Sequence, residues 1–291
     1  MRIFVTGATG FQGATIAQQL LTEHHEVVTL KRNTSEGMPL IPGIKVVPGG
    51  LEDKESLATA LQGTDAAVFM LPLIFDMDLA KRYTANFIEA AKAQHVPLVV
   101  FNTTFYLPTE ETGLLALDMK VTMKHMLDTS GLNVITVVPD VYIDNLVAPW
   151  SIPVIINDHV LPYPVASGKK IPWISHVDLG KYVAAAIQKP ELAGEVLYIG
   201  GNLYSGEEIA ETIGTKIDAH IHFIGVAPND FEQQLIPGFG ALAAREISNL
   251  YRYVEQNHES FIGKDFAKSN ELLSVTPQTL TEWVDSVRWS L

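Results

Sequence analysis

The sequence has 291 residues, of which 47% are apolar and 18% charged, so it can fill a core and differs from a disordered chain. This length fits one large domain or two small ones. The formal charge of −13 would repel duplex nucleic acid, and no run of Lys and Arg offsets it. Cysteine is absent, which excludes disulfides, thiolate metal sites and cysteine nucleophiles. We therefore expect no nucleic-acid partner.

The chain opens with MRIFVTGATG, a short apolar run that ends in glycines. Such a run is too short and too soon interrupted for a secretory signal or a membrane span. We expect a cytoplasmic protein that makes no use of a membrane.

Three glycines separate a predicted strand over residues 2–6 from a helical pattern that begins at Ala14, and a second predicted strand follows over 27–30. This strand, glycine loop, helix and strand order is the context in which a glycine fingerprint binds a dinucleotide, although tight turns need glycine as well. Main-chain N–H groups at the start of a helix would hold the phosphates. The predicted phosphate-binding residues are Gly7, Ala8, Thr9, Gly10, Phe11, Gln12 and Gly13.

Glycine is needed for a different physical reason at each of the three positions of this loop. Gly7 permits the tight turn that leaves the strand, and Gly10 lets the backbone approach a pyrophosphate. Gly13 lets the helix lie close to the sheet.

The end of the second strand indicates which dinucleotide is bound. It reads Lys31-Arg32 and continues with Asn33, Thr34 and Ser35. Two cations followed by polar side chains suit a 2′-phosphate, which an acidic residue at this place would repel. The alternative is an ordinary solvated basic pair. We expect NADP, with NADPH preferred over NADH.

The chain up to residue 138 continues to alternate helices with apolar strands. Strands are predicted over 44–47, 66–70, 98–102 and 133–138, and helices over 53–61, 79–94 and 114–130. This alternation predicts an α/β fold with a doubly wound parallel Rossmann sheet. Right-handed crossovers place the carboxyl ends of the strands, and hence a ligand, at one edge.

Polar residues follow one of these buried strands at that edge. We expect Asn102 and Thr103 to contact the cofactor and Thr104 the substrate, although Asn and Thr also commonly cap turns. The exit of a neighbouring strand contains Met70, Leu71 and Pro72. These residues could contact the cofactor or pack in a turn.

The pattern changes after Asp144. The segment 149–172 contains five prolines and reads as irregular chain, before a predicted helix over 177–188 and a strand over 196–199. The remaining predicted elements are helices, over 205–213, 229–235, 241–254 and 277–287. We expect a dinucleotide-binding domain of residues 1–148, to which 174–200 return. A smaller, mostly helical substrate lobe would comprise 149–173 and 201–291.

Metal binding is not expected. His220 and His222 could share one face of a strand, but two histidines fall short of the four ligands of a structural zinc site.

The stretch TGATGFQG at residues 6–13 resembles the extended and atypical short-chain dehydrogenases/reductases, and above all their NmrA-like branch. Further similar segments are Arg32, Gly50-Leu51-Glu52-Asp53, Lys120 with Ser130-Gly131-Leu132, Asp144-Asn145-Leu146 and residues 173–178. The resemblance covers roughly residues 1–200. It implies that Arg32 binds the 2′-phosphate and that the segment Gly50-Leu51-Glu52-Asp53 lies near the adenine.

The same resemblance bears on the remaining site residues. It implies that Met70, Leu71 and Pro72 pack the cofactor against backbone, and that Lys120 orients the nicotinamide ribose or polarises the substrate. We expect Tyr142 and Asn145 to contact the substrate, because aromatic residues near the proline-rich segment could stack on a flat acceptor, although lobe packing explains them too. These aromatics are Tyr106, Tyr142, Trp150, Tyr163 and Trp173.

One departure from the superfamily pattern bears on activity. A Tyr normally stands four residues before the catalytic Lys as proton donor, and here that residue is Ala116. The absence disfavours ketone reduction, which needs a positioned acid, more than the reduction of a quinone, which spreads the arriving charge. The first hypothesis is an NADP(H)-dependent reductase of a small conjugated acceptor such as a quinone.

Two alternatives stay open. The NmrA-like branch includes regulators, so the second hypothesis is a non-catalytic dinucleotide sensor that acts on a partner protein. The third is a nucleotide-sugar epimerase or dehydratase, which Ala116 disfavours. As partners we expect a small-molecule acceptor, and a protein partner or a second copy in a homodimer.

Overall fold

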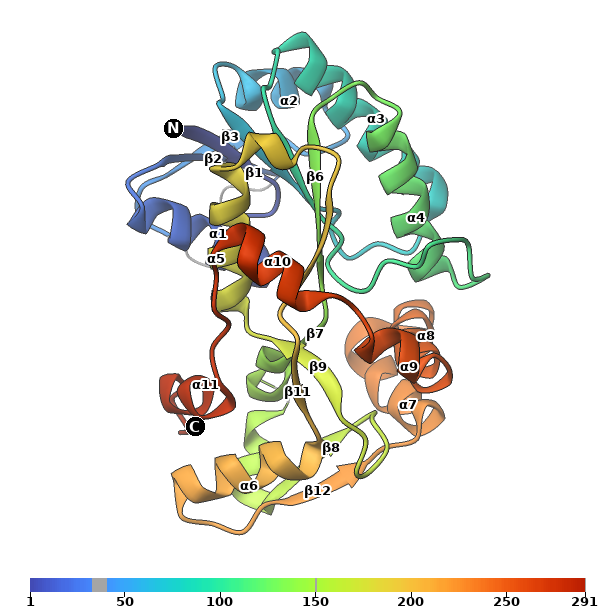
Figure 1. Ribbon diagram of the computed structural model, residues 1–291. Helices are drawn as coiled ribbons and strands as arrows, with labels where there is room; N and C mark the ends of the chain where they lie inside the picture. Colours follow the sequence, from blue (N-terminus) through green and yellow to red (C-terminus); the bar gives the residue numbers. More distant parts are fainter. Residues whose placement is uncertain (33–40, 150, 291) are drawn as a thin grey trace. The chain divides into compact units, whose positions relative to one another are not determined.

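The computed structural model describes residues 1–32, 41–149 and 151–290 (Figure 1). The chain divides into two compact units. The first unit comprises Met1–Pro139, His176–Ile199 and Phe266–Val275, and the second comprises Asp140–Ser175, Gly200–Asp265 and Thr276–Leu291.

The first unit is built on a seven-stranded sheet in the order β10-β6-β5-β4-β1-β2-β3, in which every strand pair is parallel. The strands are β1 (Arg2–Val5), β2 (Glu26–Lys31), β3 (Ile44–Pro48), β4 (Ala66–Phe69), β5 (Val99–Asn102), β6 (Val134–Pro139) and β10 (Val196–Ile199). Strands β4, β5 and β6 are buried along their whole length, as expected when helices cover both faces of a parallel sheet. The doubly wound Rossmann-like fold predicted from the alternating pattern is therefore confirmed.

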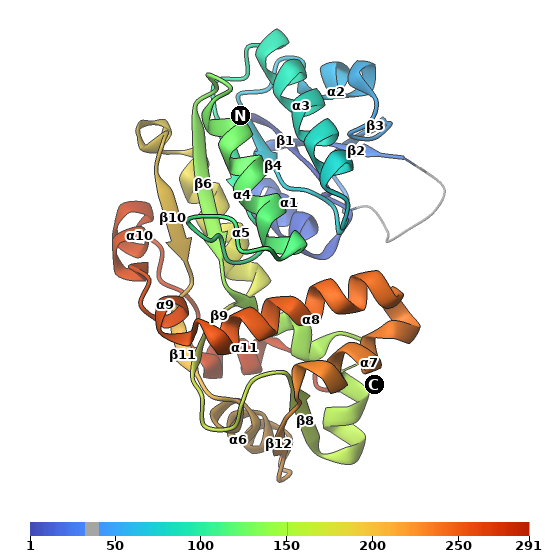
Figure 2. The same cartoon turned by 90° about the vertical axis from the view of Figure 1, so that its right-hand side faces the viewer.

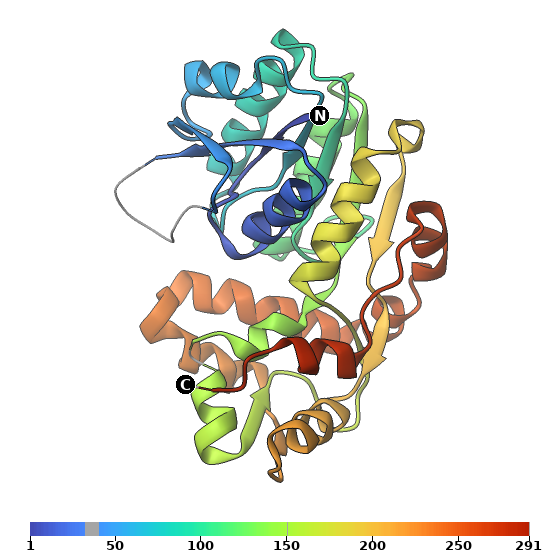
Figure 3. The same ribbon diagram turned by 90° about the vertical axis from the view of Figure 1, so that its left-hand side faces the viewer.

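Helices cover both faces of this sheet (Figures 2 and 3). One layer consists of α2 (Lys54–Leu61), α3 (Met77–Ala93) and α4 (Leu115–Asp128), and the other contains α1 (Phe11–Thr22) and α5 (His176–Ile187), with α10 (Phe266–Leu273) beside β10. Stacked rings join the α3 layer to the sheet: the centroid of Phe87 lies 4.3 Å from that of Phe69 and 6.4 Å from that of Phe4. These contacts pack α3 onto the middle of the sheet.

The second unit contains two small sheets and several helices. One sheet has the order β11-β9-β7, and β12 pairs with β8 in the other. The elements are β7 (Val141–Tyr142), β8 (Val160–Tyr163), β9 (Ile171–Ile174), β11 (Asn202–Tyr204), β12 (His222–Gly225), α6 (Gly206–Ile217), α7 (Pro228–Phe239), α8 (Ala241–Gln256), α9 (His258–Ile262) and α11 (Leu280–Ser286). Three short helical turns complete the described chain: Ile143–Val147 and Val154–Asp158 in the second unit, and Pro190–Leu192 in the first.

The structure differs from the sequence prediction in the proline-rich segment. Residues 149–172 contain β8 and the start of β9 where irregular chain was expected. Pro162 is tolerated because β8 belongs to a two-stranded sheet, in which each strand leaves one edge unpaired. Residues 266–275, expected in the lobe, pack in the first unit, and 140–148 lie in the second.

A buried ion pair joins distant parts of the second unit. The Lys264 ammonium donates to Asp140, and the side chains are 5% and 0% exposed. Burial outweighs their attraction, so the pKa of Asp140 is raised to about 7 and that of Lys264 is lowered. Oδ2 of Asp140 has no hydrogen-bond partner among the described residues.

Candidate functional site

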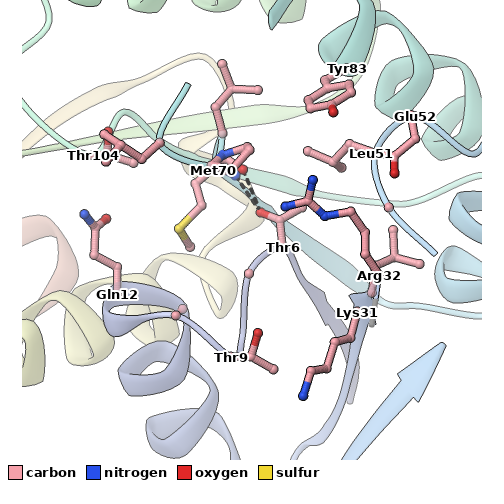
Figure 4. Close-up of a pocket in the computed structure, with 18 of the residues that line it drawn as sticks. Thr6, Thr9, Gln12, Lys31, Arg32, Leu51, Glu52, Met70, Tyr83 and Thr104 are labelled. Atoms are coloured by element: carbon pink, nitrogen blue, oxygen red, sulfur yellow. Dashed lines mark hydrogen bonds between the residues drawn. The ribbon is translucent and has the colours of Figure 1, made fainter. Parts of the chain in front are cut away.

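A pocket of about 850 Å³ lies at the carboxyl edge of the first unit's sheet (Figure 4). The segments that follow β1, β2, β3, β4 and β5 all contribute to its wall, together with the start of α1 and one residue of α3. The lining residues are Thr6, Gly7, Thr9, Gly10, Phe11, Gln12, Gly13, Leu30, Lys31, Arg32, Gly49, Gly50, Leu51, Glu52, Met70, Leu71, Pro72, Leu73, Tyr83 and Thr104.

The glycine loop is shaped by one very close approach. A Cβ at residue 13 would lie 2.1 Å from the carbonyl oxygen of Gly7, so only glycine fits there. Gly7 has a φ of +66°, in the left-handed region that favours glycine, and its carbonyl accepts a hydrogen bond from Gly10 N at 2.8 Å. A Cβ at residue 10 would make only an ordinary 3.4 Å contact, so Gly10 leaves open space at the pocket rather than avoiding a clash.

Ala8 alone of the seven loop residues predicted to bind phosphate does not line the pocket. It is 1% exposed, and its N–H lies 3.4 Å from Oγ1 of the buried Thr29. Ala8 therefore anchors the loop to β2.

Helix α1 presents its N-terminus to the pocket. Gly10 is the N-cap residue and offers no side-chain cap, and the first turn contains no acidic residue. The first N–H groups of a helix have no intrahelical acceptor, and the helix dipole favours negative charge near them. The geometry suits a bound anion such as a phosphate.

The ends of β1 and β4 are tied together beneath the pocket. The Thr6 hydroxyl accepts a hydrogen bond from Met70 N at 2.7 Å and lies 3.0 Å from the Met70 carbonyl oxygen, as Figure 4 shows. This double contact fixes the backbone that leads into Leu71 and Pro72, so that these residues form one wall.

Positive charge lies at the end of β2. Both Lys31 and Arg32 line the pocket, and Arg32 is exposed. Figure 4 shows the Arg32 guanidinium directed into the pocket and the Lys31 ammonium directed elsewhere. After the neighbouring strand β3, the Glu52 carboxylate lies over Gly50, where a Cβ would be 2.5 Å from it. Asn33, Thr34 and Ser35, the polar residues considered with this pair, lie outside the described residues.

Asp53, predicted to lie near the adenine, does not line the pocket. Its side chain caps α2 by accepting hydrogen bonds from Glu55 N at 3.0 Å and Ser56 N at 3.2 Å. Hydrogen bonds from Ser56 and Glu55 lower the pKa of Asp53. Gly49, Gly50, Leu51 and Glu52, just before it, line the pocket instead.

The residues after β5 form a hydrogen-bond network. Asn102 is fully buried, and its Nδ2 donates to Oε1 of Gln12 at 3.1 Å. Its Oδ1 accepts from Thr104 N at 2.9 Å. Thr103 is also buried and donates its hydroxyl to the carbonyl oxygen of Phe105. Of the three residues predicted to contact ligands, Thr104 lines the pocket, whereas Asn102 and Thr103 support it from behind.

Lys120 on α4 joins this network. Its Nζ donates to the Thr103 carbonyl oxygen at 2.6 Å and to Thr104 Oγ1 at 2.9 Å. The residue keeps part of its surface exposed, but protein atoms enclose the ammonium, and this burial lowers the pKa of Lys120 to about 7. Ala116 lies one turn earlier on α4 and is 7% exposed.

The two remaining substrate candidates belong to the second unit. Tyr142 is buried in β7, and Asn145 donates to the hydroxyl of Tyr163 at 3.3 Å. The hydroxyls of Tyr163 and Tyr251 lie 2.7 Å apart, and burial raises the pKa of Tyr163 to about 12. Neither Tyr142 nor Asn145 lines the pocket of the first unit. Trp150 lies outside the described residues.

The resemblance had placed Gly50, Leu51 and Glu52 near the adenine, and they line the pocket. Several other lining residues were not predicted. They lie at or beside strand ends and could have been found by extending each strand exit: Thr6, Leu30, Gly49 and Leu73. Tyr83 had no such signal, because it belongs to the apolar stripe of α3 and is only 8% exposed.

The described residues contain no group of three or more His, Asp or Glu side chains able to hold a metal ion. His220 and His222 lie side by side with ring centroids 4.3 Å apart. Among the same residues, no helix has the length and apolar character needed to span a membrane.

Solved structures with related folds differ in activity. A nucleoside-diphosphate-sugar epimerase from Staphylococcus aureus is 25% identical, with a TM-score of 0.78 over 98% of this chain and 99% of that one. An NADPH-dependent quinone oxidoreductase from Escherichia coli, in complex with NADPH, is 21% identical, with a TM-score of 0.74 over 98% and 99%. NmrA, a negative transcriptional regulator in complex with NADP, is 14% identical, with a TM-score of 0.72 over 98% and 94%.

Sequence relatives match over stretches of different length. An uncharacterized protein of Saccharomyces cerevisiae is 27% identical over 117 residues, which are 37% of this chain and 39% of that protein. One of Schizosaccharomyces pombe is 27% identical over 244 residues, 75% of this chain and 81% of that protein. The sequence profile of the NmrA-like family matches residues 1–284. The chain therefore belongs to the NmrA-like family.

Proposed function

We propose that this chain binds NADP(H) in the pocket of the first unit and reduces a small conjugated acceptor such as a quinone. The observation that carries the proposal is the uncapped N-terminus of α1, which Gly13 allows to lie against the loop at the pocket floor. The quinone oxidoreductase of similar fold binds NADPH, which supports the choice of cofactor class.

The lining residues fit a dinucleotide. A pocket of about 850 Å³ falls within the range of small-molecule sites, roughly 300–1,000 Å³. Gly7 and residues 9–13 would hold the pyrophosphate through main-chain N–H groups, and the Met70–Pro72 backbone would contact the cofactor along one wall. Arg32, with Lys31, would bind the 2′-phosphate, because a guanidinium binds phosphate through two parallel hydrogen bonds.

The polar groups near Lys120 suit reduction of a conjugated acceptor. The bound dinucleotide would supply the hydride, and the chain would orient the reactants and exclude water. Ala116 offers no hydroxyl at the position of the superfamily Tyr, so an acceptor that spreads the arriving charge suits this site better than a simple ketone.

The test of this function compares two cofactors in one variant. Arg32→Ala should weaken NADPH by about 1–3 kcal/mol, or roughly 5- to 150-fold, because it removes a charge-assisted contact, while NADH affinity changes little. Calorimetric titration of both cofactors measures this difference, and Arg82→Ala, an exposed arginine on α3 outside the pocket, is the control. Equal losses for NADPH and NADH would contradict the assigned contact.

Activity needs its own measurement. Steady-state oxidation of NADPH with a panel of quinones should show turnover. Tight cofactor binding without turnover for any acceptor would reject the reductase and favour the second candidate.

That second candidate is a dinucleotide sensor. It is favoured by Ala116 in place of the superfamily Tyr and by the similar fold of NmrA, a transcriptional regulator that binds NADP. A sensor must bind the oxidised and reduced cofactor with different affinities, because only a difference can shift a conformational equilibrium. Equal affinities for NADP⁺ and NADPH would reject it. The third hypothesis, a nucleotide-sugar epimerase, is supported by the similar fold of such an epimerase. Calorimetric titration with a nucleotide sugar tests it, and we expect no binding.

A further inference from the structure

Thr104 combines three features that no other described pocket residue shares. It lines the pocket, its hydroxyl oxygen accepts a hydrogen bond from the Lys120 ammonium at 2.9 Å, and its backbone has a φ of +63°. Figure 4 shows Thr104 on the side of the pocket opposite Lys31.

The hydrogen bonds of this hydroxyl leave its proton available. A threonine hydroxyl has one proton to donate and two lone pairs to accept with. Lys120 uses one lone pair, and among the described residues it is the one partner of Thr104 Oγ1. The Thr104 proton therefore has no acceptor there, and Thr104 lines the pocket in which a ligand would lie.

The backbone at Thr104 is held in a conformation that a β-branched residue rarely adopts. The buried Asn102 stabilises it by accepting a hydrogen bond from Thr104 N at 2.9 Å. Glycine would adopt this conformation without strain, whereas threonine places a hydroxyl here at the cost of backbone strain. Strained residues of this kind cluster at functional sites.

We infer that Thr104 is the catalytic proton donor to the oxygen of the reduced acceptor, and that Lys120 replaces the proton it gives. The inference rests on the proposed reductase function. The acceptor gains a hydride from the cofactor, and one of its oxygens becomes negatively charged. The Thr104 O–H bond then breaks as the new O–H bond forms on the acceptor. Lys120 returns a proton to Oγ1 and recovers one from solvent, so the sum is acceptor, NADPH and H⁺ converted to reduced acceptor and NADP⁺.

Lys120 has the properties that this second step needs. Its burial lowers its pKa to about 7, so it can lose and regain a proton near neutral pH. Its charged neighbours on α4 are bonded elsewhere: Asp118 accepts from Thr112 N and Gly113 N, and Lys124 donates to Asp128. The strand exit that contacts Lys120, residues 102–104, contains no titratable side chain.

The experiment compares Thr104→Val, which removes the hydroxyl at constant shape, with Thr104→Ser, which keeps it. Thr122→Val is the matched control, because this α4 threonine only bonds back to the Asp118 carbonyl oxygen. With quinones whose reduced oxygens are strongly basic, Thr104→Val should lower kcat by about 10²- to 10⁴-fold. The loss should shrink as those oxygens become more acidic, Thr104→Ser should recover most of the rate, and Thr122→Val should match the unmodified protein.

A second readout needs no turnover. 4-Nitrophenol, whose anion is yellow, imitates the charged oxygen of a reduced quinone. Bound beside NADP⁺, it should ionise at a lower pH than in water in the unmodified protein and in Thr104→Ser, and this shift should be absent in Thr104→Val. NADP⁺ affinity, measured by calorimetry, should stay the same in all three.

The outcomes separate the two proposals. Turnover of quinones with no effect of Thr104→Val, or with an equal loss for every acceptor, overturns the role of Thr104 and leaves the reductase function standing. A Thr104-dependent shift of the phenol without turnover of any acceptor supports the proton-donating site and rejects the reductase. The absence of a phenol shift in the unmodified protein overturns the inference.

Discussion

Gly13→Ala tests whether the contact between α1 and the glycine loop shapes the pocket. The added Cβ would lie 2.1 Å from the Gly7 carbonyl oxygen, 2.5 Å from its carbon and 2.9 Å from Ala8 N. Ordinary contacts begin at 3.4 Å, so helix and loop would have to separate by 3.4 − 2.1 = 1.3 Å. All three atoms belong to the backbone, so no side-chain rotation relieves the clash.

The cost follows from this displacement. Overpacking of this kind costs about 1–3 kcal/mol, and the reduced freedom of the unfolded chain returns about 0.4–1 kcal/mol. The net loss of about 1–2 kcal/mol corresponds to a Tm lower by roughly 2–8 °C for a protein of this size. A shift of the helix N-terminus by more than an ångström would also remove one or more charge-assisted hydrogen bonds to a phosphate, each about 1.5–3 kcal/mol. NADPH affinity should therefore fall by roughly 10- to 150-fold.

Thermal unfolding measures the loss of stability, and calorimetric titration with NADPH measures the loss of affinity. Substitutions at two other glycines distinguish these two effects. Gly10→Ala makes only a 3.4 Å contact but places a methyl group in the pocket, so binding should weaken at nearly constant Tm. The Cβ added by Gly238→Ala on α7 meets no atom within 4 Å. This variant should bind NADPH normally, and its free energy of unfolding should rise by no more than about 1 kcal/mol. Unchanged NADPH affinity and Tm in Gly13→Ala would refute the reasoning.

Two further predictions concern pH and the buried ion pair. Because burial lowers the pKa of Lys120 to about 7, the charged fraction of Lys120 falls as the pH rises above 7. With acceptors that need a proton, kcat should fall over the same pH range, and Lys120→Met should abolish this pH dependence. Lys264→Met leaves the Asp140 carboxyl buried without its partner and should lower the free energy of unfolding in urea by about 3–5 kcal/mol. Lys268→Met, which removes an ion pair at the surface, should lower it by only about 0–1 kcal/mol. Burial raises the pKa of Asp140 from 3.8 to about 7, and Lys264 limits that rise, so in Lys264→Met the folded Asp140 stays protonated to a still higher pH. The penalty should therefore be nearly constant below about pH 7, where folded Asp140 is protonated in both proteins, and should grow as the pH rises above it; a penalty that stays constant from below pH 7 to well above it would contradict this assignment.

The sequence predicted the parts of the fold that depend on local periodicity. Alternating helices and apolar strands indicated the parallel sheet, and the spacing of Gly7, Gly10 and Gly13 indicated a loop at its edge, where the pocket lies. Thr104 could be placed at that edge because it lies two residues after the end of the apolar strand β5. Each of these signals lies within a few residues of the feature it predicts.

The features that sequence analysis missed depend on contacts between distant residues. Strand β8 contains Pro162 and is completed by β12, about sixty residues later, so its own residues gave little sign of a strand. The amphipathic pattern of α10 indicates a buried face but not the surface that covers it, which belongs to the first unit. Asp53 was predicted from its motif, yet its carboxylate caps α2, because an Asp just before a helix can satisfy that helix's N–H groups as readily as it can bind a ligand.

The hydrogen bond between Asn102 and Gln12 connects the two halves of the proposed chemistry. Gln12 belongs to the first turn of α1, where we propose that the phosphates bind, and Asn102 holds Thr104 in its unusual conformation. Because Asn102 is fully buried, its amide cannot exchange either partner for solvent. A ligand that displaces α1 would therefore also displace the Thr104 hydroxyl. On these proposals the buried Asn102 side chain would couple cofactor binding to proton donation, and would give either a reductase or a sensor a route from the phosphates to the far end of the pocket.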